Sequence, residues 1–180
     1  SYDSVWATHL ILPYLNPMGV VVSAQNAVND ELIAPIVGFT RVIGCVITMG
    51  AGLYEPGHAL RTSNATRHAF TIGELNGMTT QRVRVLADLM RSIGDVTVTT
   101  NLWGERWAKL ATNCMANPVA ALTGLGTAKQ RQTHDVVDLI VKIGTEVVRV
   151  GKALGVQVEP IGGVPAETYE RVNDMQAMKE

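Results

Sequence analysis

Two apolar, β-branched segments separated by a polar loop and a short helical segment constrain the fold most strongly. Residues 20–22 (VVV) form the first segment, and residues 41–48 (RVIGCVIT) form the second. Between them, residues 24–29 are polar, and residues 31–37 have a helical pattern. A strand–helix–strand order of this kind predicts a parallel sheet. Ligands of such sheets bind beyond the carboxyl ends of the strands, so residues 23–29 are a predicted ligand site.

The rest of the first hundred residues contains more short strand patterns and one amphipathic helix. Residues 49–54, 58–62 and 69–72 are predicted antiparallel additions to the same sheet. Residues 81–92 have apolar side chains at helical spacing, and residues 95–99 alternate as an edge strand does.

From residue 101 the pattern becomes helical. Residues 102–116, 135–154 and 165–178 are predicted helices. The Asn117-Pro118 pair is predicted to interrupt the first of them, because the residue before proline is disfavoured in the α region.

These patterns predict two domains of different class. Residues 1–100 fit an α/β domain with a parallel sheet, and residues 101–180 fit an all-helical domain. The chain starts at Ser1 inside an apolar segment and ends at Glu180 just after a helical pattern. We therefore expect an internal piece of a longer protein.

The composition excludes several classes of protein. Hydrophobic residues make up 47% of the chain, enough for a core, and the net charge of −1 argues against nucleic-acid binding. No signal peptide and no membrane span are visible in the sequence. Cys45 and Cys114 are isolated, so we expect a reduced, cytoplasmic setting, and the four histidines have no metal-ligand spacing.

A polar stripe in the helical half is the strongest candidate site. Lys109, Asn113 and Asn117 are spaced i, i+4 and i+8, which places them within about 80° on one face of a helix. An ammonium and two carboxamides on one face suit a small polar anion, with the lysine supplying charge and a proton. The spacing alone also fits a solvated lysine beside amides that cap or bridge helices.

Two further segments contain residues that could contact a ligand. Asn26 follows the first strand and could hydrogen-bond a ligand, although asparagine also favours such turns for local reasons. Gly50 and Gly52 lack the later glycine and the following helix of a dinucleotide-binding fingerprint, so we expect a tight strand connection there.

Taken together, the motifs resemble the ketopantoate reductase (2-dehydropantoate 2-reductase) family. The shared segments, in chain order, are Gln25-Asn26, Arg41-Val42-Ile43-Gly44, Glu55-Pro56-Gly57, Gly73-Glu74, Trp107-Ala108-Lys109-Leu110, Asn113, Asn117-Pro118 and Ala121-Leu122-Thr123-Gly124. The lysine-containing segment is the specific part of this match, which covers nearly the whole chain.

The resemblance implies an NADPH-dependent reductase of a small 2-oxoacid. It also implies that residues 1–100 form the C-terminal part of a Rossmann-type sheet and that a truncated helical domain follows. Lys109 matches the catalytic lysine, which acts as general acid, and Asn113 and Asn117 match substrate-binding asparagines. Asn26 matches the asparagine near nicotinamide and substrate, and Gln25 belongs to the same cofactor-binding loop. The active site is expected between the two domains, and a homodimer through the helical domain is a further expectation.

The sequence also departs from the family pattern. The glycine-rich turn that the family carries near its start is absent here, so we expect the chain alone to lack turnover. Ala27 and Asn29 replace two glycines of the loop. The alternatives are a related hydroxyacid or opine-type dehydrogenase, and a non-catalytic helical interaction domain.

Overall fold

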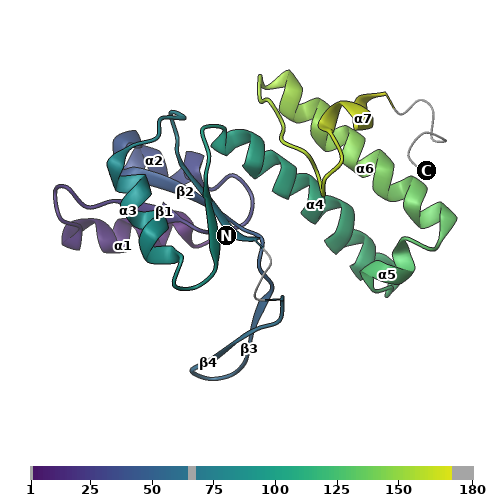
Figure 1. The fold of residues 1–180 in the computed structure, drawn as a ribbon, viewed down its shortest axis with the longest axis horizontal. Coiled ribbons are helices and arrows are strands. Elements are labelled where there is room, and N and C mark those ends of the chain that lie inside the picture. The colour runs from purple at the N-terminus through teal and green to yellow at the C-terminus, as the bar shows by residue number, and fades with distance from the viewer. Residues whose placement is uncertain (1, 65–67, 172–180) are drawn as a thin grey trace. The chain divides into compact units, whose positions relative to one another are not determined.

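A computed structural model describes residues 2–64 and 68–171 of the chain. The chain divides into two compact units, residues 1–102 and residues 103–180. The first unit contains the strands, and the second is built from helices (Figure 1). The expected fold class, an α/β part followed by a helical part, is confirmed.

The sheet of the first unit has the strand order β1-β2-β5-β6. β1 (Val21–Ser23) and β2 (Val42–Ile47) are parallel, as the strand–helix–strand pattern predicts. β5 (His68–Glu74) runs antiparallel to β2, and β6 (Asp95–Val98) is parallel to β5 and forms the edge. The predicted antiparallel addition near residue 70 and the predicted edge strand are therefore both confirmed.

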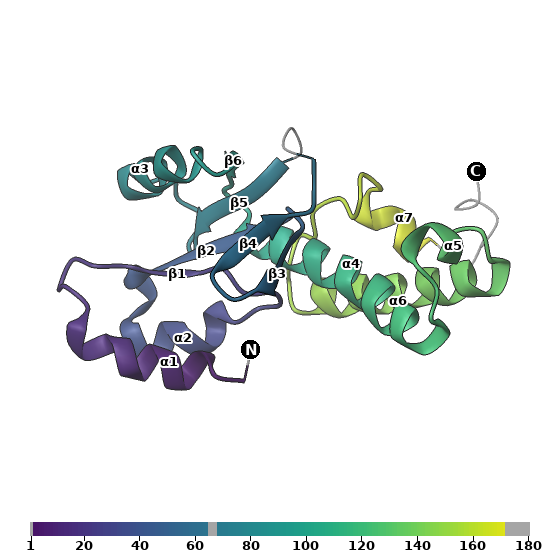
Figure 2. The same ribbon diagram turned by 90° about the horizontal axis from the view of Figure 1, so that it is seen from below.

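Helices cover both faces of this sheet. Figure 2 shows α3 (Gln81–Met90) on one side, and α1 (Ser4–Ile11) and α2 (Asp30–Val37) on the other. Residues of β2 alternate between the faces, because Ile43 packs in a cluster with α3 while Val42 packs with α2. Short 3₁₀ turns follow α1 at Leu12–Tyr14 and α2 at Phe39–Arg41.

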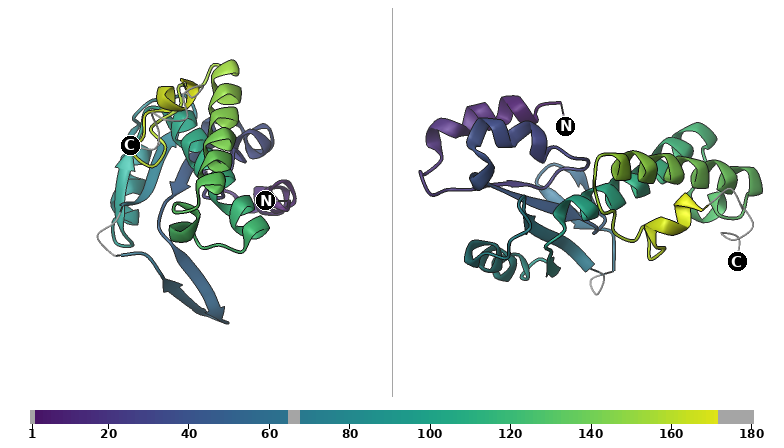
Figure 3. Two further views of the ribbon diagram at one scale, coloured as in Figure 1. Left: turned by 90° about the vertical axis from the view of Figure 1, so that its right-hand side faces the viewer. Right: turned by 90° about the horizontal axis from the view of Figure 1, so that it is seen from above.

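The predicted extension of the sheet by residues 49–62 is wrong. β3 (Ala51–Glu55) and β4 (His58–Arg61) pair only with each other within the described chain, as a two-stranded ribbon that leaves the sheet (Figure 3). Almost every residue of the ribbon is exposed or half-buried, Leu53 and Tyr54 included. The alternating apolar face that would hold these strands on the core is missing, and each strand satisfies the backbone groups of the other.

A glycine in the sheet makes room for the first residue of the long helix. Gly44 of β2 is paired with Gly73 of β5. A Cβ atom at Gly44 would overlap the end of the Leu102 side chain, whereas one at Gly73 would come within 2.8 Å of the main-chain oxygen of Thr99 and would meet Leu102 Cβ at an ordinary contact distance of 3.4 Å. Leu102 is only 1% exposed, so the glycine at position 44 admits this side chain to the core.

The predicted break at Asn117-Pro118 is also wrong. α4 runs from Leu102 to Thr123 with Pro118 inside it, and Gly124 ends it in a left-handed conformation (φ 68°). An internal proline costs about 3 kcal/mol of helix stability. Val119 is 2% exposed, and burial of this side chain offsets part of that cost, so packing overrides the local preference.

The second unit packs α4 against α6 (His134–Ala153), side by side and antiparallel. Gly144 of α6 contacts Met115, and Gly151 contacts Trp107. α5 (Thr127–Gln130) and α7 (Ala166–Glu170) complete the unit. The helix predicted for residues 165–178 ends at Glu170, and its last residues lie outside the described chain.

No helix in residues 2–64 and 68–171 is both long and apolar enough to span a bilayer.

A buried carboxylate ties three elements of the first unit together. Glu74, at the end of β5, accepts hydrogen bonds from Thr80 Oγ1 (2.5 Å) and Arg82 Nε (2.7 Å). Arg82 also pairs with the second Glu74 oxygen and donates to the Thr40 carbonyl. The hydrogen bond from Arg82, together with that from Thr80, lowers the pKa of Glu74 below its ordinary value despite burial. Glu74 is therefore a structural residue.

We predict that Glu74→Gln lowers the free energy of unfolding at pH 7 by about 1–3 kcal/mol. Because the pKa is lowered in the folded state, this stabilisation is complete above about pH 4.5 and is lost as the pH falls through the folded pKa. Urea unfolding of wild type and variant between pH 3 and 7 measures both effects. Glu146→Gln, at an exposed position of α6, is the control and should change little.

Candidate functional site

The loop after β1 is held by hydrogen bonds to α1. Gln25 Nε2 donates to Ser4 Oγ (2.9 Å), and Ser23 Oγ donates to Gln25 Oε1 (3.4 Å). Ser4 Oγ also lies 3.4 Å from Asn29 Oδ1. The Gln25 side chain is thus engaged in bracing the loop, and Ser4 is a residue that the sequence reasoning missed.

The side chain of Asn26 is presented differently from that of Gln25. Asn26 is exposed, and its carbonyl accepts a hydrogen bond from Asn29 Nδ2 (2.5 Å). This bond is made to the main-chain oxygen, and the Asn26 carboxamide itself makes no hydrogen bond with the described residues. A carboxamide can donate and accept at once, which suits the amide or ribose groups of a nicotinamide nucleotide.

Ala27 adopts a positive φ of 66°, alone among the described non-glycine residues. Such a conformation costs about 1–2 kcal/mol for a residue with a Cβ atom. Asn29 fixes the turn from the other side through its bond to the Asn26 carbonyl. The backbone conformation suited to glycine is therefore kept here although the glycine is replaced.

The polar stripe on α4 lies on the outer side of that helix within its own unit. Ala108, Ala111 and Met115 pack in a cluster with Val148, Ile161 and Tyr169. These three α4 residues lie roughly 140–200° around the helix axis from Asn113. Lys109, Asn113 and Asn117 therefore point away from the core of the unit, about 6 Å apart along the axis.

Lys109 is the titratable group of the stripe, and it is half-buried. Burial lowers the pKa of its ammonium below the ordinary value, because the charged form loses solvation. Asn113 is half-buried as well, and Asn117 is exposed. A lysine with a lowered pKa gives up its proton more readily at neutral pH, which suits a general acid.

The structure brings together the predicted residues in two groups, one per unit. Gln25 and Asn26 share the loop of the first unit, and Lys109, Asn113 and Asn117 share the outer face of α4 in the second. Arg106, which the sequence reasoning missed, lies on the same face of α4 and is 2% exposed. Its position three residues before Lys109 was the available signal.

The described residues contain no cluster of histidine, cysteine, aspartate or glutamate that could hold a metal ion.

Family profiles match both units of the chain. The profile described as Ketopantoate reductase PanE/ApbA matches residues 1–77, and the profile described as Ketopantoate reductase PanE/ApbA C terminal matches residues 101–179. The chain belongs to the ketopantoate reductase family. The resemblance inferred from the sequence motifs is thereby confirmed.

Individual members of the ketopantoate reductase family are similar over long stretches. A 2-dehydropantoate 2-reductase from Mesorhizobium japonicum is 33% identical over 127 residues, which is 70% of this chain and 38% of the relative. The chain thus spans less than half the length of this curated relative.

Solved structures share the fold. A 2-dehydropantoate 2-reductase from Geobacter metallireducens has a TM-score of 0.80 at 24% identity, over 99% of this chain and 58% of the other. A complex of D-mandelate dehydrogenase with NADH has a TM-score of 0.80 at 15% identity, over 99% and 59%. At these identities the likeness concerns the fold alone.

We predict that Ala27→Gly raises the free energy of unfolding by about 0.5–1 kcal/mol, because glycine adopts the positive φ without strain. Urea unfolding of the full chain measures this change. Ala24→Gly, in the same loop, is the matched control and should lower the value by about 0.5–1 kcal/mol. Equal losses in the two variants would contradict the conformation of Ala27.

We predict that an NMR titration of the Lys109 ε-methylene carbon gives a pKa below that of a solvated lysine. Between the pKa of Lys109 in the folded chain and its higher pKa in the unfolded chain, the unfolded chain binds more protons than the folded chain does. Wild type should therefore gain stability relative to Lys109→Met as the pH rises through that interval. A titration at the ordinary lysine pKa would mean that the ammonium is fully solvated.

Proposed function

We propose that the natural full-length protein reduces a 2-oxoacid of the ketopantoate type to a 2-hydroxyacid with NADPH. The observation that carries this proposal is the half-buried Lys109 on the outer face of α4, in line with Asn113 and Asn117. Membership of the ketopantoate reductase family and the relatives named 2-dehydropantoate 2-reductase support it.

Lys109 serves as the general acid in this proposal. A ketone oxygen gains negative charge as the carbonyl carbon is reduced, and a nearby ammonium stabilises that charge. The ammonium then donates its proton to the oxygen, which completes the hydroxyl group. The lowered pKa of Lys109 makes this transfer easier than from a solvated lysine.

Asn113 and Asn117 orient the substrate. One and two turns of α4 separate them from Lys109, so their carboxamides form a line about 12 Å long with the ammonium at one end. Carboxamides can bond both the carboxylate and the hydroxyl groups of a small hydroxyacid. With its carboxylate held along this line, the 2-oxo group lies next to the ammonium.

The loop after β1 fits one end of a nicotinamide cofactor. Asn26 has an exposed carboxamide at the carboxyl end of a parallel strand, where such ligands bind, and Gln25 braces the loop through Ser4. A bound nicotinamide supplies the hydride for the reduction. The chain has no glycine-rich turn that opens a helix, so these residues serve the nicotinamide end and not the diphosphate.

Which 2-oxoacid is reduced, and whether NADPH or NADH is used, is decided by an activity assay. The D-mandelate dehydrogenase with the same fold makes an aromatic 2-oxoacid the second candidate substrate. A panel of ketopantoate, benzoylformate and pyruvate, each with NADPH and NADH, separates the candidates. Dimer formation through the helical unit stays a prediction that the mass of the protein in solution checks.

We predict that Lys109→Ala lowers kcat of the full-length enzyme by about 10²–10⁴-fold, because it removes the proton donor. Steady-state kinetics with the best substrate of the panel measures the loss, and circular dichroism checks the fold. Lys142→Ala, at an exposed position of α6, is the matched control and should retain kcat. Near-normal turnover of Lys109→Ala would exclude the lysine as general acid, and no turnover of wild type on any substrate would favour an interaction domain.

A further inference from the structure

A cavity of about 380 Å³ lies within the helical unit, bordered by α4, α5, α6 and α7. Its apolar wall is formed by Met115 of α4, Ile140 of α6, and Ile161 and Val164 from the turn before α7. A cavity of this size holds a small organic molecule.

Tyr169 lines this cavity with a polar group that the fold leaves unused. The residue is 5% exposed, and its ring packs against Gly144. A Cβ atom at Gly144 would come within 2.9 Å of the ring. Its hydroxyl forms no hydrogen bond with any of the described residues. The hydroxyl is therefore available to bond an oxygen atom of a ligand.

Arg131 is the one charged residue among the described residues that line the cavity. It is exposed, follows the end of α5, and makes no ion pair within the described chain. A single positive charge at the rim of an apolar cavity suits a monoanion. A phosphate dianion would require more donors than this lining offers.

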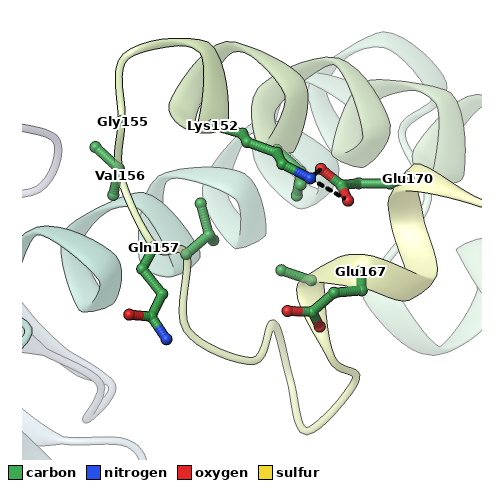
Figure 4. A pocket seen from close by; sticks show the side chains of 9 residues that line it. Lys152, Gly155, Val156, Gln157, Glu167 and Glu170 are labelled. Atoms are coloured by element: carbon green, nitrogen blue, oxygen red, sulfur yellow. Dashed lines mark hydrogen bonds and ion pairs between the residues drawn. The ribbon is translucent and has the colours of Figure 1, made fainter.

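A neighbouring hollow of about 340 Å³ has a lining of different charge. Lys152 there is paired with Glu170 (2.8 Å), and Glu167 is the second carboxylate of its lining (Figure 4). One lysine and two glutamates leave this hollow with a negative charge, so it disfavours an anion. The two cavities of the helical unit therefore differ in the sign of their charge.

We propose that the cavity beside Tyr169 binds a small monocarboxylate that has an apolar body and a second oxygen, such as a hydroxyl group. Arg131 pairs with the carboxylate, the wall around Met115 and Ile161 encloses the body, and the Tyr169 hydroxyl bonds the second oxygen. Met115 lies about 160° around α4 from Asn113, so this site and the Lys109 stripe use different faces of the helix. The proposal does not depend on the reductase activity.

The probe for this site is 3-hydroxy-3-methylbutyrate, titrated into the full chain and followed by methyl NMR signals of Met115 and Ile161. Arg131→Ala and Tyr169→Phe should each weaken binding by about threefold to tenfold, since each removes one polar contact and keeps the packing. The uncharged amide of the probe should bind at least threefold more weakly than the acid. Arg149→Ala, an exposed arginine of α6 outside the cavity, should bind as wild type does.

Lys109→Ala distinguishes the two sites. Unchanged binding of the probe to this variant supports a separate site, whereas loss of binding assigns the probe to the α4 stripe and overturns the proposal. Equal affinity for acid and amide, or unchanged affinity in both Arg131→Ala and Tyr169→Phe, would overturn it as well.

Discussion

The packing of Leu102 against Gly44 is the contact that fixes the last residue of the first unit. Gly44 and Gly73 are paired across β2 and β5, and the Leu102 side chain fills the space that the missing Cβ atom of Gly44 leaves. Interiors are close-packed, so a larger residue at Gly44 would have to displace the leucine. The first residue of α4 is thus held in the core of the first unit by the absence of a side chain in the sheet.

The apolar and polar faces of α4 follow from helical geometry. Ala108, Ala111 and Met115 hold one face of the helix in the core of its unit, so the opposite face is left for polar groups. Lys109 and Asn113 remain half-buried on that opposite face. Partial burial lowers the pKa of the Lys109 ammonium, because the charged form loses solvation.

Periodicity in the sequence predicted the elements whose side chains are buried on one face. The parallel β1–β2 pair, α2, α3 and most of α6 were found this way, and so was the α4 stripe. The β3–β4 ribbon was misplaced because strand propensity does not show whether a strand joins a sheet. The break at Pro118 was wrongly predicted, since burial of Val119 lies outside the local pattern. The brace from Ser4 to Gln25 spans 21 residues, and spacing rules of a single element cannot show it.

Proline at position 118 also changes the backbone chemistry of α4. It has no amide hydrogen, so the carbonyl oxygen of Cys114 receives no helical hydrogen bond from residue 118. This oxygen belongs to the residue directly after Asn113, within the turn that leads to Asn117. Main-chain acceptors released in this way attract water or a hydroxyl group. The helix thereby contains one main-chain acceptor whose usual donor is missing whatever the neighbouring side chains are, and only a change at the proline itself would restore that donor.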